Sequence, residues 1–256
     1  MSEPPAVLSE RRERVLLITI NRPDQRNAVN AAVASGIAAA LDQLDGDAEL
    51  SVGVLTGAGK GFCSGMDLKA FVSGERPYAE GRGFAGIVER PAEKPLIAAV
   101  EGFAVAGGLE VALACDMIVA ARGARLGIPE VKRSLVAAGG ALLRLPKVLP
   151  HTIAMELALT GEPITAERAH ELGLVNRLSE PGQATSTALE LAGTVAANGP
   201  LALAATKRVM RESVEWPEPE FFSRQRAIID PVFSSEDARE GAGAFAEKRE
   251  PVWRGR

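Results

Sequence analysis

Two glutamates stand in surroundings that could give them chemical roles. Glu110 is the only charged residue between Gly102 and Asp116, in a run that is otherwise apolar, polar uncharged or glycine. Burial of a carboxylate is unfavourable unless the group has a polar partner or a functional role. Burial also raises the pKa of the carboxyl group. The structural alternative is a glutamate in the first turn of a helix, where the helix dipole favours a negative charge. Both interpretations are open from these residues alone.

The glycines before this carboxylate add a second function. Gly107 and Gly108 open the expected helix, and bare backbone N–H groups at a helix start can stabilise an anion. An oxyanion donor beside a carboxylate forms a compact catalytic unit. The turn Gly61–Lys69 follows an expected strand, and a free N–H at Met66 would be a second donor. The alternative for this turn is structural, with Asp67 capping a helix, and both interpretations can hold together.

The second glutamate, Glu130, follows Pro129 near the start of an expected helical turn. From the first glutamate the chain runs along a helix of about nine residues at ~1.5 Å each and returns along a strand of about five at ~3.3 Å each. These excursions are similar in length, so both carboxylates can reach one site. Two carboxyl groups in different protonation states are suited to general acid and base chemistry.

Other familiar sites fit less well. Residues 81–86 match the dinucleotide pattern G-x-G-x-x-G, but residues 75–80 are not expected to form the strand that this pattern requires. Ser64 could act as a nucleophile, but the only histidines, His151 and His170, stand in polar helical contexts far along the chain. No spacing of His, Cys and carboxylate residues resembles a metal site, so we expect none.

The elements that must position these groups indicate an α/β fold. Residues 31–44 are expected to form an alanine-rich helix, and apolar runs of strand length occur at 15–20, 52–56, 96–100 and 117–121. After about residue 200 the strand pattern disappears, and amphipathic helices are expected at 201–212, 218–229 and 235–249. We therefore predict a core over residues 1–198 and a helical region over residues 199–256.

Composition narrows the classes of protein. The chain has 256 residues, of which 46% are hydrophobic and 24% charged, as is typical of a globular protein. The net charge of −4 and the interspersed charges argue against nucleic acid or an anionic membrane as a partner. Cys63 and Cys115 lie in apolar segments, and the first ten residues lack a signal-peptide pattern, so we expect a reduced protein in the cytoplasm. Apolar stretches are shorter than the ~20 residues of a membrane helix.

The chain resembles the crotonase superfamily, and within it the enoyl-CoA hydratases and their carnitinyl-CoA dehydratase relatives. The matches run in order through the chain: Ile20–Pro23, Arg26–Ala28 with Asn30, Leu55–Gly59, Phe62–Gly65 with Asp67–Leu68, Lys94–Val100, Gly107–Glu110, Ala114–Asp116, Pro129–Glu130, Arg144–Pro146, Leu159–Gly161 and Glu171–Asn176. The resemblance implies a crotonase-like α/β core of repeated ββα units, with C-terminal helices that build homotrimers or hexamers.

The resemblance also implies a reaction, the reversible addition of water across the 2,3-double bond of an enoyl-CoA thioester. The backbone N–H groups of Met66 and Gly107 would polarise the thioester carbonyl. Glu110 would activate the water that adds at C3, and Glu130 would deliver or remove the proton at C2. Coenzyme A is part of the substrate, and no other cofactor is implied.

Further residues are implied to contact coenzyme A. From the same chain these are Arg26, Ala28, Ser64, Asp67, Leu68, Lys69 and Gly108, and from a neighbouring subunit Phe245 and Lys248 would reach the adenine and phosphate portion. The alternative for the last two is an ordinary amphipathic terminal helix.

One departure from the family's pattern affects the reaction. Ala138 stands where the family's loop has a glycine whose backbone approaches the reacting water, and an added methyl group could reshape the acyl pocket. Carnitinyl-CoA-type dehydration and enoyl-CoA isomerisation therefore remain alternatives. Outside this chemistry, a non-catalytic acyl-CoA-binding protein and a serine peptidase-like enzyme are the competing classes.

Overall fold

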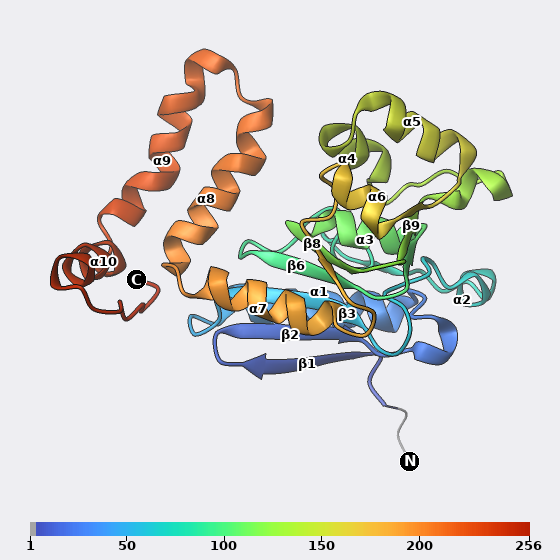
Figure 1. Ribbon diagram of the computed structural model, residues 1–256, viewed down its shortest axis with the longest axis horizontal. Helices are drawn as coiled ribbons and strands as arrows, with labels where there is room; N and C mark the ends of the chain where they lie inside the picture. Colours follow the sequence, from blue (N-terminus) through green and yellow to red (C-terminus); the bar gives the residue numbers. More distant parts are fainter. Residues whose placement is uncertain (1–3) are drawn as a thin grey trace.

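A six-stranded sheet forms the centre of the computed structural model, which describes residues 4–256 (Figure 1). Its strands lie in the order β1-β2-β3-β6-β8-β11, and only the β1–β2 pair is antiparallel. The bounds are β1 (Val7–Arg12), β2 (Val15–Ile20), β3 (Val52–Gly57), β6 (Leu96–Val100), β8 (Met117–Ala121) and β11 (Arg177–Ser179). The four apolar runs are thus confirmed as neighbouring strands.

A second sheet of three short strands completes a repeating unit. Its order is β10 (Ile164–Thr165), β9 (Arg125–Gly127) and β7 (Phe103–Val105). In succession β6, β7 and α3 (Gly107–Ala114) give one strand to each sheet and then a helix. Strands β8 and β9 again give one strand to each sheet, and the 3-10 helix η2 (Pro129–Arg133) follows them. This arrangement confirms the expected ββα units.

One local expectation was wrong. A two-residue strand, β4 (Tyr78–Ala79), lies inside residues 75–80 and pairs antiparallel with β5 (Gly83–Phe84). The glycines at 81 and 83 have positive φ angles and allow this tight hairpin, which a hydrophobic pattern does not reveal. Between residues 85 and 95 no helix follows, so the hairpin still lacks the geometry of a dinucleotide-binding turn.

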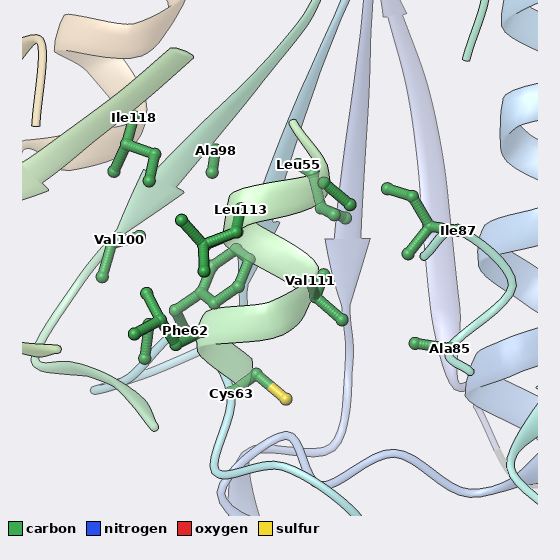
Figure 2. Packing of buried hydrophobic residues seen from close by; sticks show 14 of the residues in the cluster. Leu55, Phe62, Cys63, Ala85, Ile87, Ala98, Val100, Val111, Leu113 and Ile118 are labelled. Carbon is green, nitrogen blue, oxygen red and sulfur yellow. The ribbon is translucent and has the colours of Figure 1, made fainter. Parts of the chain in front are cut away.

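The large sheet is buried on both faces, because successive residues of a strand point to opposite sides. Val54 packs in a cluster with helix α7 (Ala184–Ala196), whereas its neighbour Leu55 packs in the main core on the α3 side. Figure 2 shows Val111 and Leu113 of α3 among the apolar side chains of this main core. The helix that carries Glu110 is therefore held firmly against the sheet.

The other helices of residues 4–198 surround these sheets. They are η1 (Pro23–Gln25), α1 (Ala31–Gly46), α2 (Leu68–Val72), α4 (Ala141–Val148), α5 (His151–Thr160) and α6 (Ala166–Glu171). Asn30 caps α1 by accepting a hydrogen bond from the Val33 N–H at 3.0 Å, which fixes the predicted start of that helix.

Residues 199–256 form an arm that extends from the core as α8 (Pro200–Glu212), α9 (Phe221–Phe233) and α10 (Glu236–Glu247) (Figure 1). Three helices were predicted here, and the structure confirms them with shifts of a few residues. Two 3-10 turns, η3 (Ser213–Glu215) and η4 (Glu218–Glu220), connect α8 to α9. The boundary between a core and an arm as separate domains stays a prediction.

A membrane-spanning helix was also considered. Within residues 4–256 no single helix combines the length and apolar character needed to cross a bilayer. The pair 184–196 and 200–215 meets those criteria only when taken together, across a bend of 105°.

Candidate active site

Glu110 lies in the first turn of α3, as the structural interpretation expected, and it is also buried, with 4% of its surface exposed. Its Oε1 accepts a hydrogen bond from the Ala141 N–H at 3.1 Å. Burial raises the pKa of the Glu110 carboxyl, and the backbone N–H groups of Ala141 and Gly139 and the nearby Arg144 guanidinium oppose that rise. The result is a carboxyl group fixed in position whose pKa lies above that of an exposed glutamate.

Glu130 lies in η2, as the sequence indicated, and is half-buried. Its Oε2 is shielded from solvent and has no hydrogen-bond partner among residues 4–256. Burial raises the pKa of Glu130, and the Glu110 carboxylate raises it further because two negative charges repel each other. The structure therefore brings both carboxyl groups close enough to influence one another, and it leaves one oxygen of Glu130 without a partner among the described residues.

The turn at Gly65–Met66 packs directly against the start of α3. Gly65 has a φ of +95°, and a Cβ atom at this position would lie 3.0 Å from the Gly107 nitrogen and 2.9 Å from the Ala106 Cβ. No described residue accepts a hydrogen bond from the N–H of Met66 or of Gly107. Two backbone donors without an acceptor among these residues thus occur on two segments that pack against each other, as an oxyanion hole would require.

Strained backbone at Ala106 sets the direction of this helix start. Ala106 has φ 53° and ψ −132°, a conformation that costs a non-glycine residue about 1–3 kcal/mol. Its N–H donates to Gly127 O at 2.9 Å, and its carbonyl accepts from Leu109 N at the same distance. These hydrogen bonds hold the strained turn in place. The next N–H, that of Gly107, donates neither to a strand nor within the helix.

The residues predicted to contact coenzyme A from the same chain lie around this turn. Arg26 accepts a backbone hydrogen bond from Ser64 N at 3.1 Å, which joins two of these segments, and Val29 pairs with Met66 in an isolated bridge. Ala28 is buried, whereas Leu68 and Lys69 are exposed. Their contact with coenzyme A stays a prediction.

Asp67 and Gly108, two of the predicted binding residues, have structural roles. Asp67 accepts hydrogen bonds from the N–H groups of residues 69 and 70 at the start of α2, and it pairs with Arg22 at 2.9 Å. The helix-cap interpretation of Asp67 is therefore confirmed, and its carboxylate is already occupied. Gly108 is buried against the Cys63 carbonyl, which leaves no room for a Cβ atom.

Phe245 and Lys248 do not join the site within one chain. Both are exposed on or next to α10, with Phe245 87% exposed, and Figure 1 shows α10 at the end of the molecule opposite α2. Their role at the active site of a neighbouring subunit stays a prediction.

The chain is similar to known proteins over most of its length. The family described as enoyl-CoA hydratase/isomerase matches residues 10–256. The chain belongs to the enoyl-CoA hydratase/isomerase family. An enoyl-CoA hydratase of Mycobacterium tuberculosis is 44% identical over 261 residues, which cover 98% of this chain and 97% of the relative. A carnitinyl-CoA dehydratase of Salmonella enteritidis is 42% identical over 250 residues, which cover 94% and 95%.

Solved structures from this family are also similar. The crystal structure of an enoyl-CoA hydratase from Mycobacterium marinum has a TM-score of 0.97 and 61% identity, and it covers 99% of this chain and 100% of that one. A carnitinyl-CoA hydratase from Mycobacterium avium has a TM-score of 0.80 and 45% identity at the same coverage. The family's fold is therefore shown for the residues that the structure describes.

The nucleophile and metal alternatives concern Ser64, Cys63 and groups of metal-ligating side chains. No hydrogen bond among residues 4–256 joins Ser64 to a histidine, and His170 Nδ1 instead lies 2.8 Å from Val175 O. Burial raises the pKa of the Cys63 thiol to about 12, so this thiol is not ionised near neutral pH. Within the same residues no cluster of His, Cys, Asp and Glu could hold a metal ion.

Sequence reasoning missed the loop that fixes Glu110. Gly139 is buried, and a Cβ atom there would lie 2.5 Å from Glu110 Oε2, whereas Ala138 is exposed. The glycine that contacts the Glu110 carboxylate is thus Gly139, one residue after Ala138, the position that the sequence analysis singled out. The paired glycines after Ala138 were visible in the sequence, but their contact with α3 depends on the folded chain.

Proposed function

We propose that this chain is an enoyl-CoA hydratase that adds water reversibly across the 2,3-double bond of a 2-enoyl-CoA thioester. The observation that carries this proposal is the occurrence of two carboxyl groups, the buried Glu110 and the half-buried Glu130, together with two backbone N–H groups that have no acceptor among the described residues. Acyl transfer does not require a second carboxyl group. Hydration requires two proton transfers, one from water and one to carbon, and two carboxyl groups can carry them out.

The proposed reaction uses each group once. The thioester carbonyl oxygen accepts hydrogen bonds from the Met66 and Gly107 N–H groups, which stabilise the negative charge that develops in an enolate-like transition state. Glu110, ionised and oriented by the Ala141 N–H, takes a proton from the water that attacks C3. Glu130, protonated, delivers its proton to C2. The carboxyl groups end with their protonation states exchanged, so return of the proton through water completes the cycle.

Several features accompany this proposal. Proton transfer and backbone dipoles supply the chemistry, so we expect no metal or redox cofactor. We also propose that the exposed arm builds homotrimers or hexamers and that Phe245 and Lys248 of one subunit bind the coenzyme A of another. A cytoplasmic location is proposed with it, in keeping with two free cysteines.

Carnitinyl-CoA dehydration is the second candidate. Relatives named for it are 42% identical to this chain, and the same carboxyl pair could remove water from a 3-hydroxyacyl-CoA. The enoyl-CoA hydratase from Mycobacterium marinum is nevertheless more similar in structure, with a TM-score of 0.97 against 0.80 for the carnitinyl-CoA hydratase. Isomerisation can proceed with one carboxyl group, so the presence of two favours hydration.

The deciding experiment compares three substrates with the purified wild-type protein. Loss of the conjugated thioester absorbance follows hydration of crotonyl-CoA, and crotonobetainyl-CoA and a 3-enoyl-CoA test the alternatives. We expect crotonyl-CoA to have the largest kcat/KM. Glu110→Gln and Glu130→Gln should each lower kcat by about 10²–10⁴-fold because each removes one proton-transfer group.

Both glutamine variants keep the shape of the side chain and provide the control for a contaminating hydratase. Circular dichroism should show that they are folded. Turnover of crotonobetainyl-CoA or the 3-enoyl-CoA above that of crotonyl-CoA would reassign the reaction, and turnover unaffected by both variants would remove the carboxyl groups from the mechanism.

A further inference from the structure

Arg144 lies in α4 with its guanidinium half-buried behind the loop that contacts Glu110. Its NH1 donates to Gly139 O at 3.2 Å and its NH2 donates to Val88 O at 2.5 Å. These two carbonyl groups belong to segments far apart in the sequence. One planar guanidinium therefore fastens the 139–141 loop to the segment that follows β5.

The loop and the arginine fit one another closely. Gly140 has a φ of +99°, and a Cβ atom at this position would collide with Arg144 NH1. Gly139 leaves no room for a Cβ atom against Glu110 Oε2, and the next residue donates its N–H to Oε1 at 3.1 Å. The backbone of residues 139–141 is thus clamped between the guanidinium and the carboxylate.

Arg144 itself makes no hydrogen bond to Glu110 among the described residues. The charged and titratable groups that face it are the Glu110 carboxyl, the Cys115 thiol and the Arg211 guanidinium of α8. It touches neither of the two free N–H groups of the proposed oxyanion hole. Any effect of Arg144 on catalysis must therefore pass through the loop or through its positive charge.

We propose that Arg144 is the positioning residue for Glu110, which it holds in a reactive orientation by fastening the 139–141 loop to Val88. This proposal rests on the proposed function, because it assumes that Glu110 acts as a base. The two carbonyl groups bind two different nitrogens of one planar guanidinium fork, and the single ammonium nitrogen of a lysine cannot occupy both positions. The loop's hydrogen bond to Glu110 is therefore expected to loosen even when the positive charge is kept.

Two substitutions separate the fork from the charge. Arg144→Lys keeps the charge but not the fork, and Arg144→Met keeps only the aliphatic stem. Both should lower kcat for crotonyl-CoA by about 10–100-fold with KM changed less than about threefold, because a small misplacement of a catalytic group lowers the rate strongly. Lys147→Met, an exposed residue on the same helix, is the matched control and should match the wild type.

The pH profile separates the two contributions further. The Arg144 charge lowers the pKa of Glu110, so its loss should raise that pKa and move the acidic limb of kcat/KM to higher pH. We expect this displacement in Arg144→Met and not in Arg144→Lys. A loss of kcat shared by both variants then reports the missing fork, and a displacement of the pH profile confined to Arg144→Met reports the missing charge.

Amide hydrogen exchange at Ala141 gives a readout that does not depend on the reaction. The hydrogen bond to Glu110 protects this N–H, so exchange should be at least about tenfold faster in both Arg144 variants than in the wild type and Lys147→Met. If exchange at Ala141 or kcat stays at the control value, the proposal is overturned. If the wild type does not hydrate crotonyl-CoA, the proposed function fails, and the exchange rates still decide whether Arg144 holds the loop.

Discussion

The core and the arm differ in how far each buries its own side chains. Strands β3 and β6 are buried along almost their whole length, and α3 is buried throughout. In the arm, α9 has no buried residue, and α8 buries only Pro200 and Lys207. One chain thus completes the core but leaves the arm with a largely exposed surface.

This difference separates two kinds of function. The carboxyl groups and free N–H groups occur together in the core, where packing fixes their positions. The arm presents large apolar side chains to solvent, including Phe222, Phe233 and Phe245 with exposed fractions of 65%, 76% and 87%. Exposed apolar surface of this kind is typical of protein association. We therefore expect core substitutions to change kcat and arm substitutions to change assembly and KM.

Of the substitutions that distinguish the core from the arm, Gly65→Ala in the core is expected to have the largest effect. The added methyl group would meet Ala106 Cβ at 2.9 Å and the Gly107 nitrogen at 3.0 Å, so it should push the two N–H donors apart. Loss of one oxyanion donor lowers kcat by about 10²–10³-fold. Steady-state kinetics with crotonyl-CoA would measure this change, and KM should change much less.

Gly173→Ala is the matched control for this substitution. Gly173 also has a positive φ, +83°, but a Cβ atom there would have no neighbour within 4 Å. Both variants bear the backbone strain of alanine at positive φ, about 1 kcal/mol. Equal kcat values for the two alanine variants would show that strain, and not the oxyanion hole, is what Gly65 relieves.

A smaller effect is expected where the arm joins the core. Lys207 of α8 donates to Asp116 Oδ2 at 2.6 Å and to Lys94 O at 2.8 Å, and its side chain is only 8% exposed. Lys207→Met leaves this carboxylate without its cation. Removing one partner of a buried pair is strongly destabilising, but Asp116 is partly exposed, so we expect a loss of about 2 kcal/mol in the free energy of unfolding.

Urea denaturation followed by circular dichroism would measure this loss. The neighbouring pair of Arg208 and Glu212 is exposed at the surface of the same helix, so Arg208→Met should change the free energy of unfolding by less than about 0.5 kcal/mol. A similar loss in both variants would show that the Lys207 pair does not join arm to core more firmly than a surface pair.

The same contrast explains which parts of the fold the sequence predicted. The central strands were predicted because burial on both faces produces continuous apolar runs, and the strand at 15–20 has the predicted bounds. Strand β1 was missed because five of its six residues are exposed and its sequence, VLSERR, has no such run. Strands β7, β9 and β10 have two or three residues each, which is too short for any pattern.

The candidate site divides in a similar way. Glu110 and Gly107 stood out because a lone carboxylate and paired glycines are unusual in an apolar run. Arg144 and Arg22 could not be assigned roles, because their partners are backbone carbonyls or a carboxylate far along the chain. Such contacts depend on how distant segments meet, and a spacing rule within one segment does not contain that information.

The smallest effect is expected from Lys248→Met in the arm. If this ammonium group meets a phosphate of coenzyme A, its loss removes an exposed charge contact worth about 1 kcal/mol or less, so KM should rise about three- to fivefold with kcat unchanged. The same variant should show no change in KM with a substrate built on coenzyme A that lacks the 3′-phosphate. An equal rise in KM with both substrates would place the ammonium group away from that phosphate.

A mixing experiment tests whether the arm serves a neighbouring subunit. Glu110→Gln chains have an inactive core and an intact arm, and Lys248→Met chains have the reverse. If each site combines the core of one chain with the arm of the next, mixed oligomers contain some sites in which both parts are wild type, and these show the wild-type KM. If each chain uses its own arm, every active site carries the Lys248→Met change, and the wild-type KM never reappears on mixing.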